Sequence, residues 1–185
     1  MKAWKHFKTI SKHKMLVMQG CFKVGLYKQG LLHDLSKYTP SEFLIGVRYF
    51  QGNRSPNSAE RDDKGYSEAW MHHKGRNRHH YEYWNDMDMQ TRQYVYLPVP
   101  RKYLAEMVMD RIAASKTYQG SAYTDASALN YLLNSREQHI MHPKTRRELE
   151  YILTMLRDKG ESETFTYIKT QLLRGKPFPW EDTEE

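Results

Sequence analysis

The chain has 185 residues, and its 29 lysines and arginines against 22 acidic residues give a formal net charge of +7. Hydrophobic residues make up 39% and aromatic residues 13%, which is too polar for a membrane protein and too aromatic for a disordered chain. No run of about 18 apolar residues is present, so a spanning helix is not expected. The single cysteine, Cys21, excludes an internal disulfide framework and fits a reducing cytoplasm.

The predicted elements, taken in chain order, are almost all helices. Residues 4–29 carry apolar side chains at steps of three and four, which predicts a helix that Gly30 interrupts. Residues 39–42 (TPSE) have the pattern of a capping box with proline at the first helical position. They predict the start of a helix that ends near Phe50.

The middle of the chain is predicted to be less regular. The polar stretch 51–66 contains glycine and proline and predicts a loop. A short helix is expected from Ser67 to His73, and the segment KGRN ends it. A second short helix is expected to begin near His79. The prolines in the segment 97–100 end this region, because proline is not accommodated inside a helix.

Further helices are predicted in the last part of the chain. Gly120 is expected to end the first of them, and the third has apolar residues at i, i+3, i+4 and i+7. No stretch shows clean alternation of strand type. The predicted fold class is therefore all-α, a single-domain helical bundle over residues 1–185 with a tail at 176–185. The four predicted helices are 100–118, 126–136, 144–158 and 162–173.

The best candidate for chemistry is the adjacent pair His33 and Asp34. Neighbouring side chains on a regular helix diverge by about 100°, so only a distorted helix end can aim both into one cavity. Leu31, Leu32 and Leu35 surround the pair and predict that this segment is buried. A histidine and an aspartate that are buried together need a partner, and a metal ion is the most economical one.

The motif HDLSK at 33–37 resembles the His-Asp signature of the HD-domain superfamily of metal-dependent phosphohydrolases. Its members place a histidine on an early helix, a His-Asp pair on the next and an aspartate on a later helix, around a divalent metal in a helical bundle. The resemblance covers roughly residues 6–118, and residues 119–175 match only as additional helices. It implies four metal ligands: His13, His33, Asp34 and Asp110.

The patterns around the first and last of these residues agree with inward-facing side chains. His13 shares a helix face with Val17, so it can point inward while the adjacent lysines point out. Asp110 has Met107 three residues before it and alanines three and four residues after it. An aspartate on such an apolar face is uncommon without a partner. Two segments also resemble a bacterial and phage family of uncharacterised proteins: HDLSKYTPSEF and AWMHHKGRNRHHYEYW.

Four further histidines are concentrated at positions 72–73 and 79–80. Several HD-domain subfamilies add histidines to bind a second metal, and the resemblance assigns this role to His73 and to His79 or His80. It extends to the HD-GYP phosphodiesterases, although the GYP segment is absent here, and to the mixed-valent di-iron oxygenases of the same fold. Imidazole and carboxylate ligands suit one or two Mn²⁺, Fe²⁺, Zn²⁺, Co²⁺ or Ni²⁺ ions. His139 and His142 are not expected to be ligands.

Basic residues near these motifs are candidates for substrate binding. Lys37 follows His33 by four residues and lies on the same side if the helix continues, where it could meet a phosphate or the leaving group. Lys74, Arg76 and Arg78, in the segment KGRNR, could contact further phosphates.

The expected function is hydrolysis of a nucleotide or other phosphorylated small molecule by a metal-activated water. Asp34 would help to hold the hydroxide, and Lys37 would offset phosphate charge. Two alternatives stay open: a di-iron oxygenase with the same ligands, and a non-enzymatic basic helical protein that binds nucleic acid. No membrane partner is expected, and the sequence leaves the oligomeric state open.

Overall fold

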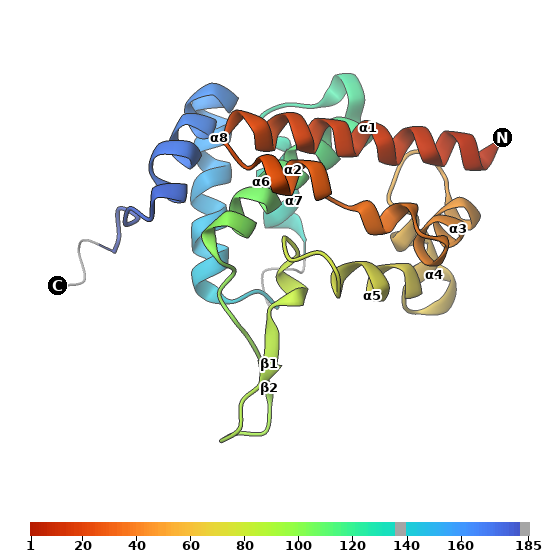
Figure 1. Cartoon of the computed structure of the whole chain (residues 1–185), viewed down its shortest axis with the longest axis horizontal. Helices are drawn as coiled ribbons and strands as arrows, with labels where there is room; N and C mark the ends of the chain where they lie inside the picture. Colours follow the sequence, from red (N-terminus) through yellow and green to blue (C-terminus); the bar gives the residue numbers. More distant parts are fainter. Residues whose placement is uncertain (136–139, 182–185) are drawn as a thin grey trace.

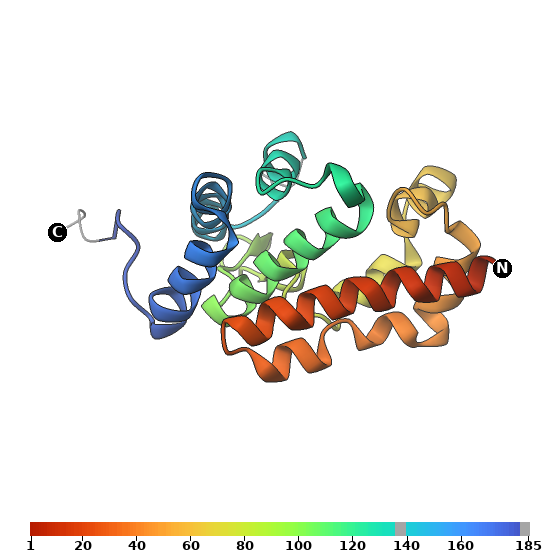
Figure 2. The same ribbon diagram turned by 90° about the horizontal axis from the view of Figure 1, so that it is seen from above.

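The computed structural model describes residues 1–135 and 140–181. Helix α1 (Lys2–Lys23) runs along one side of the molecule, and α2 (Tyr27–Leu32) turns back beside it (Figures 1 and 2). The reversal occurs at Gly25, whose φ of 87° is a left-handed conformation that glycine adopts without steric cost. The break therefore precedes α2, and the predicted interruption at Gly30 is wrong.

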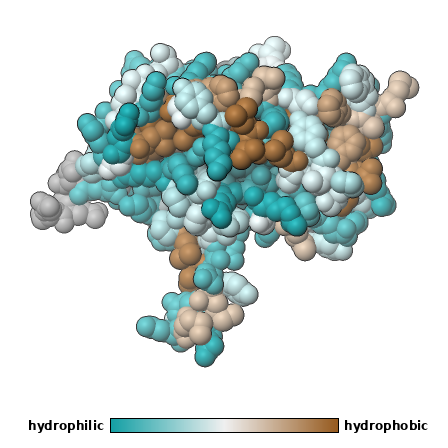
Figure 3. Space-filling model, viewed as in Figure 1, coloured by the Kyte–Doolittle hydropathy of each residue, from teal (hydrophilic) through white to brown (hydrophobic). Residues whose placement is uncertain are grey.

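Gly30 instead lies inside α2, at its closest approach to α1. A Cβ atom at this position would lie 3.0 Å from the Cβ of Cys21, so glycine allows the two helices to pack. Because this face of α2 is turned to α1, Leu31 and Leu32 point outward and are 55% and 53% exposed. Leu35 is also exposed, and apolar side chains are visible along α1 and α2 in Figure 3. The prediction that these leucines are buried is wrong.

The next elements gather around the N-terminal end of α1 (Figure 1). The helix predicted at residues 39–50 is present, but it has no capping box. The Thr39 hydroxyl donates to the Ser36 carbonyl at 2.6 Å, and the Glu42 carboxylate contacts histidines of α5. These elements are the 3-10 helix η1 (Leu35–Tyr38), α3 (Pro40–Tyr49), α4 (Pro56–Lys64) and α5 (Glu68–Lys74).

Helix α4 lies where a loop was predicted for residues 51–66, so that prediction is wrong over most of its length. The local signals for a helix are nevertheless present in the sequence. Ser55 is the N-cap residue, Pro56 occupies the first helical position, and Gly65 ends the helix with φ of 81°. The strongly polar composition conceals these signals, because Ala59 is the only buried apolar residue of α4.

The segment after α5 contains the one sheet in the described part of the chain. A 3-10 helix, η2 (Tyr81–Tyr83), replaces the short helix predicted from His79. Strand β1 (Asn85–Met87) then pairs antiparallel with β2 (Tyr94–Tyr96), and the hairpin projects from the body of the molecule (Figure 1). All residues of both strands are exposed, so no buried face imposes the alternation by which strands are recognised.

Helix α6 (Arg101–Gln119) crosses the molecule between α1 and the last helices, α7 (Ser127–Asn134) and α8 (Pro143–Thr170) (Figure 2). Gly160, with φ of 77°, interrupts α8, so the two predicted helices 144–158 and 162–173 correspond to its halves. The core cluster includes residues of α1, α6, α7 and α8. Two short 3-10 helices complete the elements of the described residues: η3 (Gly120–Ala122) and η5 (Leu172–Arg174).

The predicted tail at 176–185 belongs in part to this core. Phe178 is fully buried and stacks on Trp180, with ring centroids 4.8 Å apart. Glu181 forms an ion pair with Lys144 at 2.7 Å. The predicted all-α, single-domain fold class is confirmed. None of the helices that the structure describes combines the length and the apolarity needed to cross a bilayer.

Candidate metal centre

His33 and Asp34 both point into the protein because the backbone leaves the helical conformation between α2 and η1. His33 is the C-cap of α2, and Asp34 has φ of 54° and ψ of 27°. This left-handed conformation is one that aspartate tolerates better than most residues. Lys14 donates hydrogen bonds to the carbonyls of Leu31 and His33 and so holds this turn. His33 and Asp34 are each 1% exposed.

The first cluster joins residues from α1, the α2–η1 turn and α6. His13 Nε2 lies 2.9 Å from Asp110 Oδ1 and 3.8 Å from Asp34 Oδ2. His33 Nε2 lies 3.3 Å from the same oxygen of Asp34 and 3.6 Å from Asp110 Oδ1. One ligand atom from each of these four residues lies within 4.8 Å of all the others, a spacing that could hold a metal ion.

The second cluster joins Asp34 to three histidines from α5 and the turn that follows it. His73 Nε2 lies 3.2 Å from Asp34 Oδ1, and His79 Nε2 lies 3.5 Å from it. The Nε2 atoms of His73 and His80 are 2.9 Å apart. These four residues also meet the spacing for a metal ion. The structure thus brings both His79 and His80 to the site, where the sequence offered them as alternatives.

Asp34 belongs to both clusters, and its two oxygens have different neighbours. Oδ2 faces His13 and His33, whereas Oδ1 faces His73 and His79. A carboxylate in this position can give one oxygen to each of two ions. The clusters also approach each other at Asp110, whose Oδ2 lies 3.8 Å from His79 Nε2.

The centre contains several buried polar atoms that make no hydrogen bond within the protein. Leaving one such atom unsatisfied costs about 1–3 kcal/mol, and buried polar groups are nearly always paired. His13 Nε2 is near Asp110, but the contact does not have the direction of a hydrogen bond. The donor set, imidazole nitrogen and carboxylate oxygen, fits a divalent transition metal. The atoms are Asp34 Oδ1 and the Nε2 atoms of His13, His33 and His79, together with Asp34 Oδ2, which lacks a hydrogen bond but forms an ion pair with Lys37.

The charges in the metal-free centre keep the two aspartates and His80 in the form that binds metals. Burial lowers the pKa of His33 and His73, but the charge of Asp34 outweighs it and raises both, so a bound ion would have to displace a proton from each of these two rings. Burial raises the pKa of Asp34, but His33 and Lys37 outweigh it and hold the pKa well below its usual range. Burial also opposes ionisation of Asp110, but the close contacts with His13 and His33 outweigh it and hold the pKa of Asp110 well below its usual range. Both carboxyl groups are therefore anions at neutral pH. Burial and the neighbouring His79 hold the pKa of His80 well below its usual range, so its imidazole is neutral.

Two carboxylates outside the clusters contact histidine ligands at Nδ1, the ring nitrogen that faces away from the cluster. Glu106 Oε1 lies 2.9 Å from His33 Nδ1, and Glu42 Oε2 lies 2.8 Å from His73 Nδ1. Such contacts orient imidazoles whose other nitrogen binds a metal. Sequence reasoning missed both residues. Glu106 precedes Asp110 by one helical turn, so helical spacing could have found it, whereas Glu42 had no such signal.

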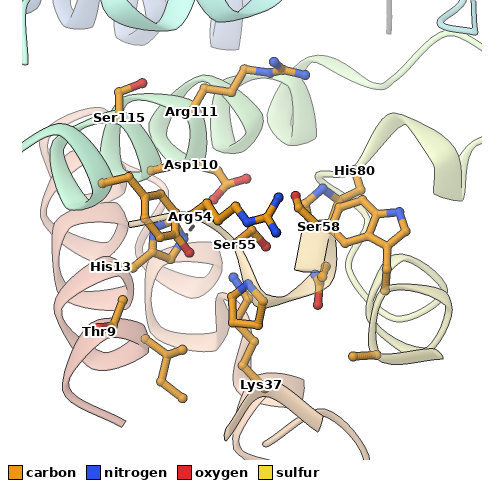
Figure 4. Close-up of a pocket in the computed structure, with 18 of the residues that line it drawn as sticks. Thr9, His13, Lys37, Arg54, Ser55, Ser58, His80, Asp110, Arg111 and Ser115 are labelled. Atoms are coloured by element: carbon orange, nitrogen blue, oxygen red, sulfur yellow. Dashed lines mark ion pairs between the residues drawn. The ribbon is translucent and has the colours of Figure 1, made fainter. Parts of the chain in front are cut away.

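A cavity of about 410 Å³ opens beside the two clusters. Figure 4 shows His13 from α1, Asp110 from α6, His80 and Lys37 converging on it from different elements. Lys37 Nζ lies 2.6 Å from Asp34 Oδ2. Burial lowers the pKa of Lys37, but the charges of Asp34 and Asp110 outweigh this and raise it, so Lys37 stays a cation. Arg54 and Arg111 also line the cavity.

The three basic residues of the KGRNR segment lie elsewhere. Lys74, Arg76 and Arg78 do not line this cavity in the described part of the chain. Arg76 donates to the His72 carbonyl, and Arg78 donates to the Tyr103 hydroxyl and lies over the Tyr83 ring. Their positions give no contact with a ligand in the cavity.

Of the remaining pair, His139 and His142, the structure describes His142, which is separate from the centre. His142 is the N-cap of α8, where its Nδ1 accepts a hydrogen bond from the Lys144 amide. His139 lies outside the residues that the structure describes.

Comparison with known families assigns the chain to a family of unknown function. The chain belongs to DUF5662, whose family model matches residues 2–155. This range contains every residue of the two clusters, both carboxylates behind them and Lys37. No curated protein and no solved structure matches the chain.

Proposed function

We propose that the protein is a metal-dependent phosphohydrolase that binds two divalent transition-metal ions, one in each cluster, with Asp34 between them. The observation that carries the proposal is the pair of Asp34 oxygens, each of which faces its own set of ligand atoms. The unsatisfied nitrogens and oxygens at the same place support it. The resemblance of HDLSK to the HD-domain signature supports the class of reaction.

The proposed reaction divides the work between the ions and the protein. Bound ions would supply Lewis-acid activation of a water for attack on phosphorus. Asp34 and Asp110 contribute negative charge to the ligand set, and the neutral imidazoles of His13 and His80 contribute nitrogen donors. Lys37 is a cation at the cavity wall and can neutralise a phosphate oxygen or the leaving group.

The proposed substrate is a nucleotide or another small phosphorylated molecule. The cavity volume of about 410 Å³ lies in the range of small-molecule sites. Its lining contains Lys37, Arg54 and Arg111, which favour an anionic ligand. Arg54 pairs with Asp62 and Gln51 on the outer side, so part of its charge is already balanced.

The proposal is tested by metal analysis together with an activity screen. Purified protein, stripped and reloaded with Mn²⁺, Fe²⁺, Co²⁺, Ni²⁺ or Zn²⁺, is expected to hold two ions per chain. The loaded protein should release inorganic phosphate from at least one member of a panel of nucleotides and sugar phosphates. The same protein treated with chelator is the control and should be inactive. At most one ion per chain with every metal, or equal activity after chelation, would contradict the proposal.

Two further measurements on the same purified protein distinguish the alternative functions. Iron-loaded protein that absorbs strongly in the visible and consumes oxygen with a substrate would replace hydrolysis by a di-iron oxygenase reaction. Binding to DNA that weakens with salt and is indifferent to chelator would favour a nucleic-acid-binding protein.

We further propose a cytoplasmic location, because Cys21 is a free, buried thiol.

A further inference from the structure

We propose that Glu106 is a positioning residue that holds one histidine of each cluster and so governs the binding of both ions. The inference rests on the proposed function for its two ions, but not for the reaction that they support. Glu106 is buried on α6, one turn before Asp110. It is absent from both groups of ligands that include Asp34.

A single oxygen of Glu106 serves two imidazole rings. Glu106 Oε1 lies 2.9 Å from His33 Nδ1 and 3.2 Å from His79 Nδ1. The opposite nitrogen of His33 faces the first cluster, and that of His79 faces the second. The centroids of the two rings are 4.4 Å apart. The carboxylate therefore sets the orientation of one ring in each cluster.

The contact also decides which nitrogen of each ring is free to bind a metal. A carboxylate that accepts a hydrogen bond from Nδ1 keeps the proton there and leaves the lone pair on Nε2. The group formed by His33, His79 and Glu106 is itself compact enough to hold an ion. In such a site the histidines would have to use Nδ1, whereas their Nε2 atoms already face Asp34. The geometry therefore favours positioning over a third site.

Glu42 provides a natural comparison, because it serves only one of the clusters. Its Oε2 lies 2.8 Å from His73 Nδ1, and its Oε1 lies 2.6 Å from His72 Nδ1. His73 belongs to the second cluster, whereas His72 belongs to neither. Loss of Glu42 should consequently affect one ion, and loss of Glu106 should affect two.

The test compares three Glu→Gln variants of the full chain by calorimetric titration with Mn²⁺. Glu106→Gln is expected to raise the dissociation constants of both ions about 10–100-fold. Glu42→Gln should raise only one of them. Glu60→Gln is the matched control, because Glu60 is also buried but accepts hydrogen bonds from Ser67 and nearby amides. It should leave both constants unchanged.

The pattern across the variants decides the inference. If Glu106→Gln weakens one ion or neither, or if the wild-type protein binds only one, the inference is overturned. If Glu42→Gln weakens the binding of both ions equally, the effect passes through the shared Asp34. The inference that Glu106 in particular positions a ring in each cluster is then overturned as well. If the three variants show the expected pattern of dissociation constants but the wild-type protein has no phosphatase activity, the inference is supported and only the proposed reaction is wrong.

A second variant covers loss of folding. If circular dichroism shows that metal-free Glu106→Gln is no longer helical, Glu106→Asp is titrated instead. It keeps the charge on a side chain one methylene shorter, so the carboxylate no longer reaches both rings and both dissociation constants should rise above those of the wild-type protein. A change in only one constant, or in none, would overturn the inference.

Discussion

The metal centre and the apolar core lie on different faces of α6 and satisfy their buried atoms in different ways. In the core, the apolar residues of α8 at positions 149, 152, 153 and 156 are fully buried against other hydrocarbon side chains. In the centre, nitrogen and oxygen atoms are buried without hydrogen bonds. The difference teaches that the core provides stability, whereas the buried polar atoms of the centre cost stability unless a ligand, such as the proposed ions, satisfies them.

The largest expected effect on the centre comes from Asp34→Asn. Asparagine tolerates the left-handed backbone at this position and has nearly the same volume, but it lacks the charge. Because Asp34 is the residue shared by the two clusters, the ion content should fall from two per chain to nearly none, as measured by elemental analysis after gel filtration. The helical circular dichroism should be unchanged. Retention of two ions would show that Asp34 is not the shared ligand.

Substitutions on one side of Asp34 should have about half that effect. His13→Ala should remove the ion of the first cluster, and His80→Ala that of the second, each leaving about one ion per chain. Elemental analysis of the two single variants and of the double variant measures this directly. The double variant should hold almost no metal. If it still holds one ion per chain, both substitutions remove the same ion, and the division into two clusters is wrong.

Lys37→Met tests the cavity without removing a ligand. It removes a cation close to Asp34 but keeps the length of the side chain. Both ions should remain, because one competitor for the Asp34 carboxylate has been removed. The value of kcat/KM for a phosphorylated substrate should fall about 100-fold, as for other groups that stabilise charge in a transition state. Loss of metal with unchanged turnover of the remaining holoprotein would contradict this role.

Leu153→Ala makes the opposite change, in the core. Leu153 is fully buried on α8, and the cavity that the substitution leaves should lower the free energy of unfolding by about 2–5 kcal/mol. Urea denaturation of the metal-free protein measures this loss. The folded variant should still bind two ions, since α8 contributes no ligand to either cluster. A large fall in ion content would mean that the two regions are not independent.

The smallest effect is expected for Arg76→Ala. Arg76 is exposed and contacts the His72 carbonyl rather than the cavity. Ion content and kcat/KM should both stay within about twofold of wild type, as is usual for surface substitutions. A loss comparable with that of Lys37→Met would restore the KGRNR segment to the substrate site.

The long helices were predictable from local patterns. The apolar steps in α1 and α8 are visible because each helix turns one stripe of side chains toward the core, whereas α6 is buried over the consecutive residues 104–109. The hairpin was missed because all residues of its two strands are exposed, so burial leaves no alternation in them. Helix α4 was missed because Ala59 is its only buried apolar residue, which is too few to form an apolar stripe. The exposed leucines beside His33 show that apolar composition alone does not decide burial.

The sequence by itself determined that the chain is helical, because helical periodicity is a short-range pattern. The candidate metal ligands came from the resemblance of HDLSK and the residues around it to the HD-domain signature. Only the tertiary structure decided that Asp34 faces two clusters, that His79 and His80 both join the second, and that Glu106 contacts a ring in each. Those relations connect α1, the α2–η1 turn, the α5 segment and α6. Helix packing sets distances between segments so far apart in the chain, and no local pattern encodes them.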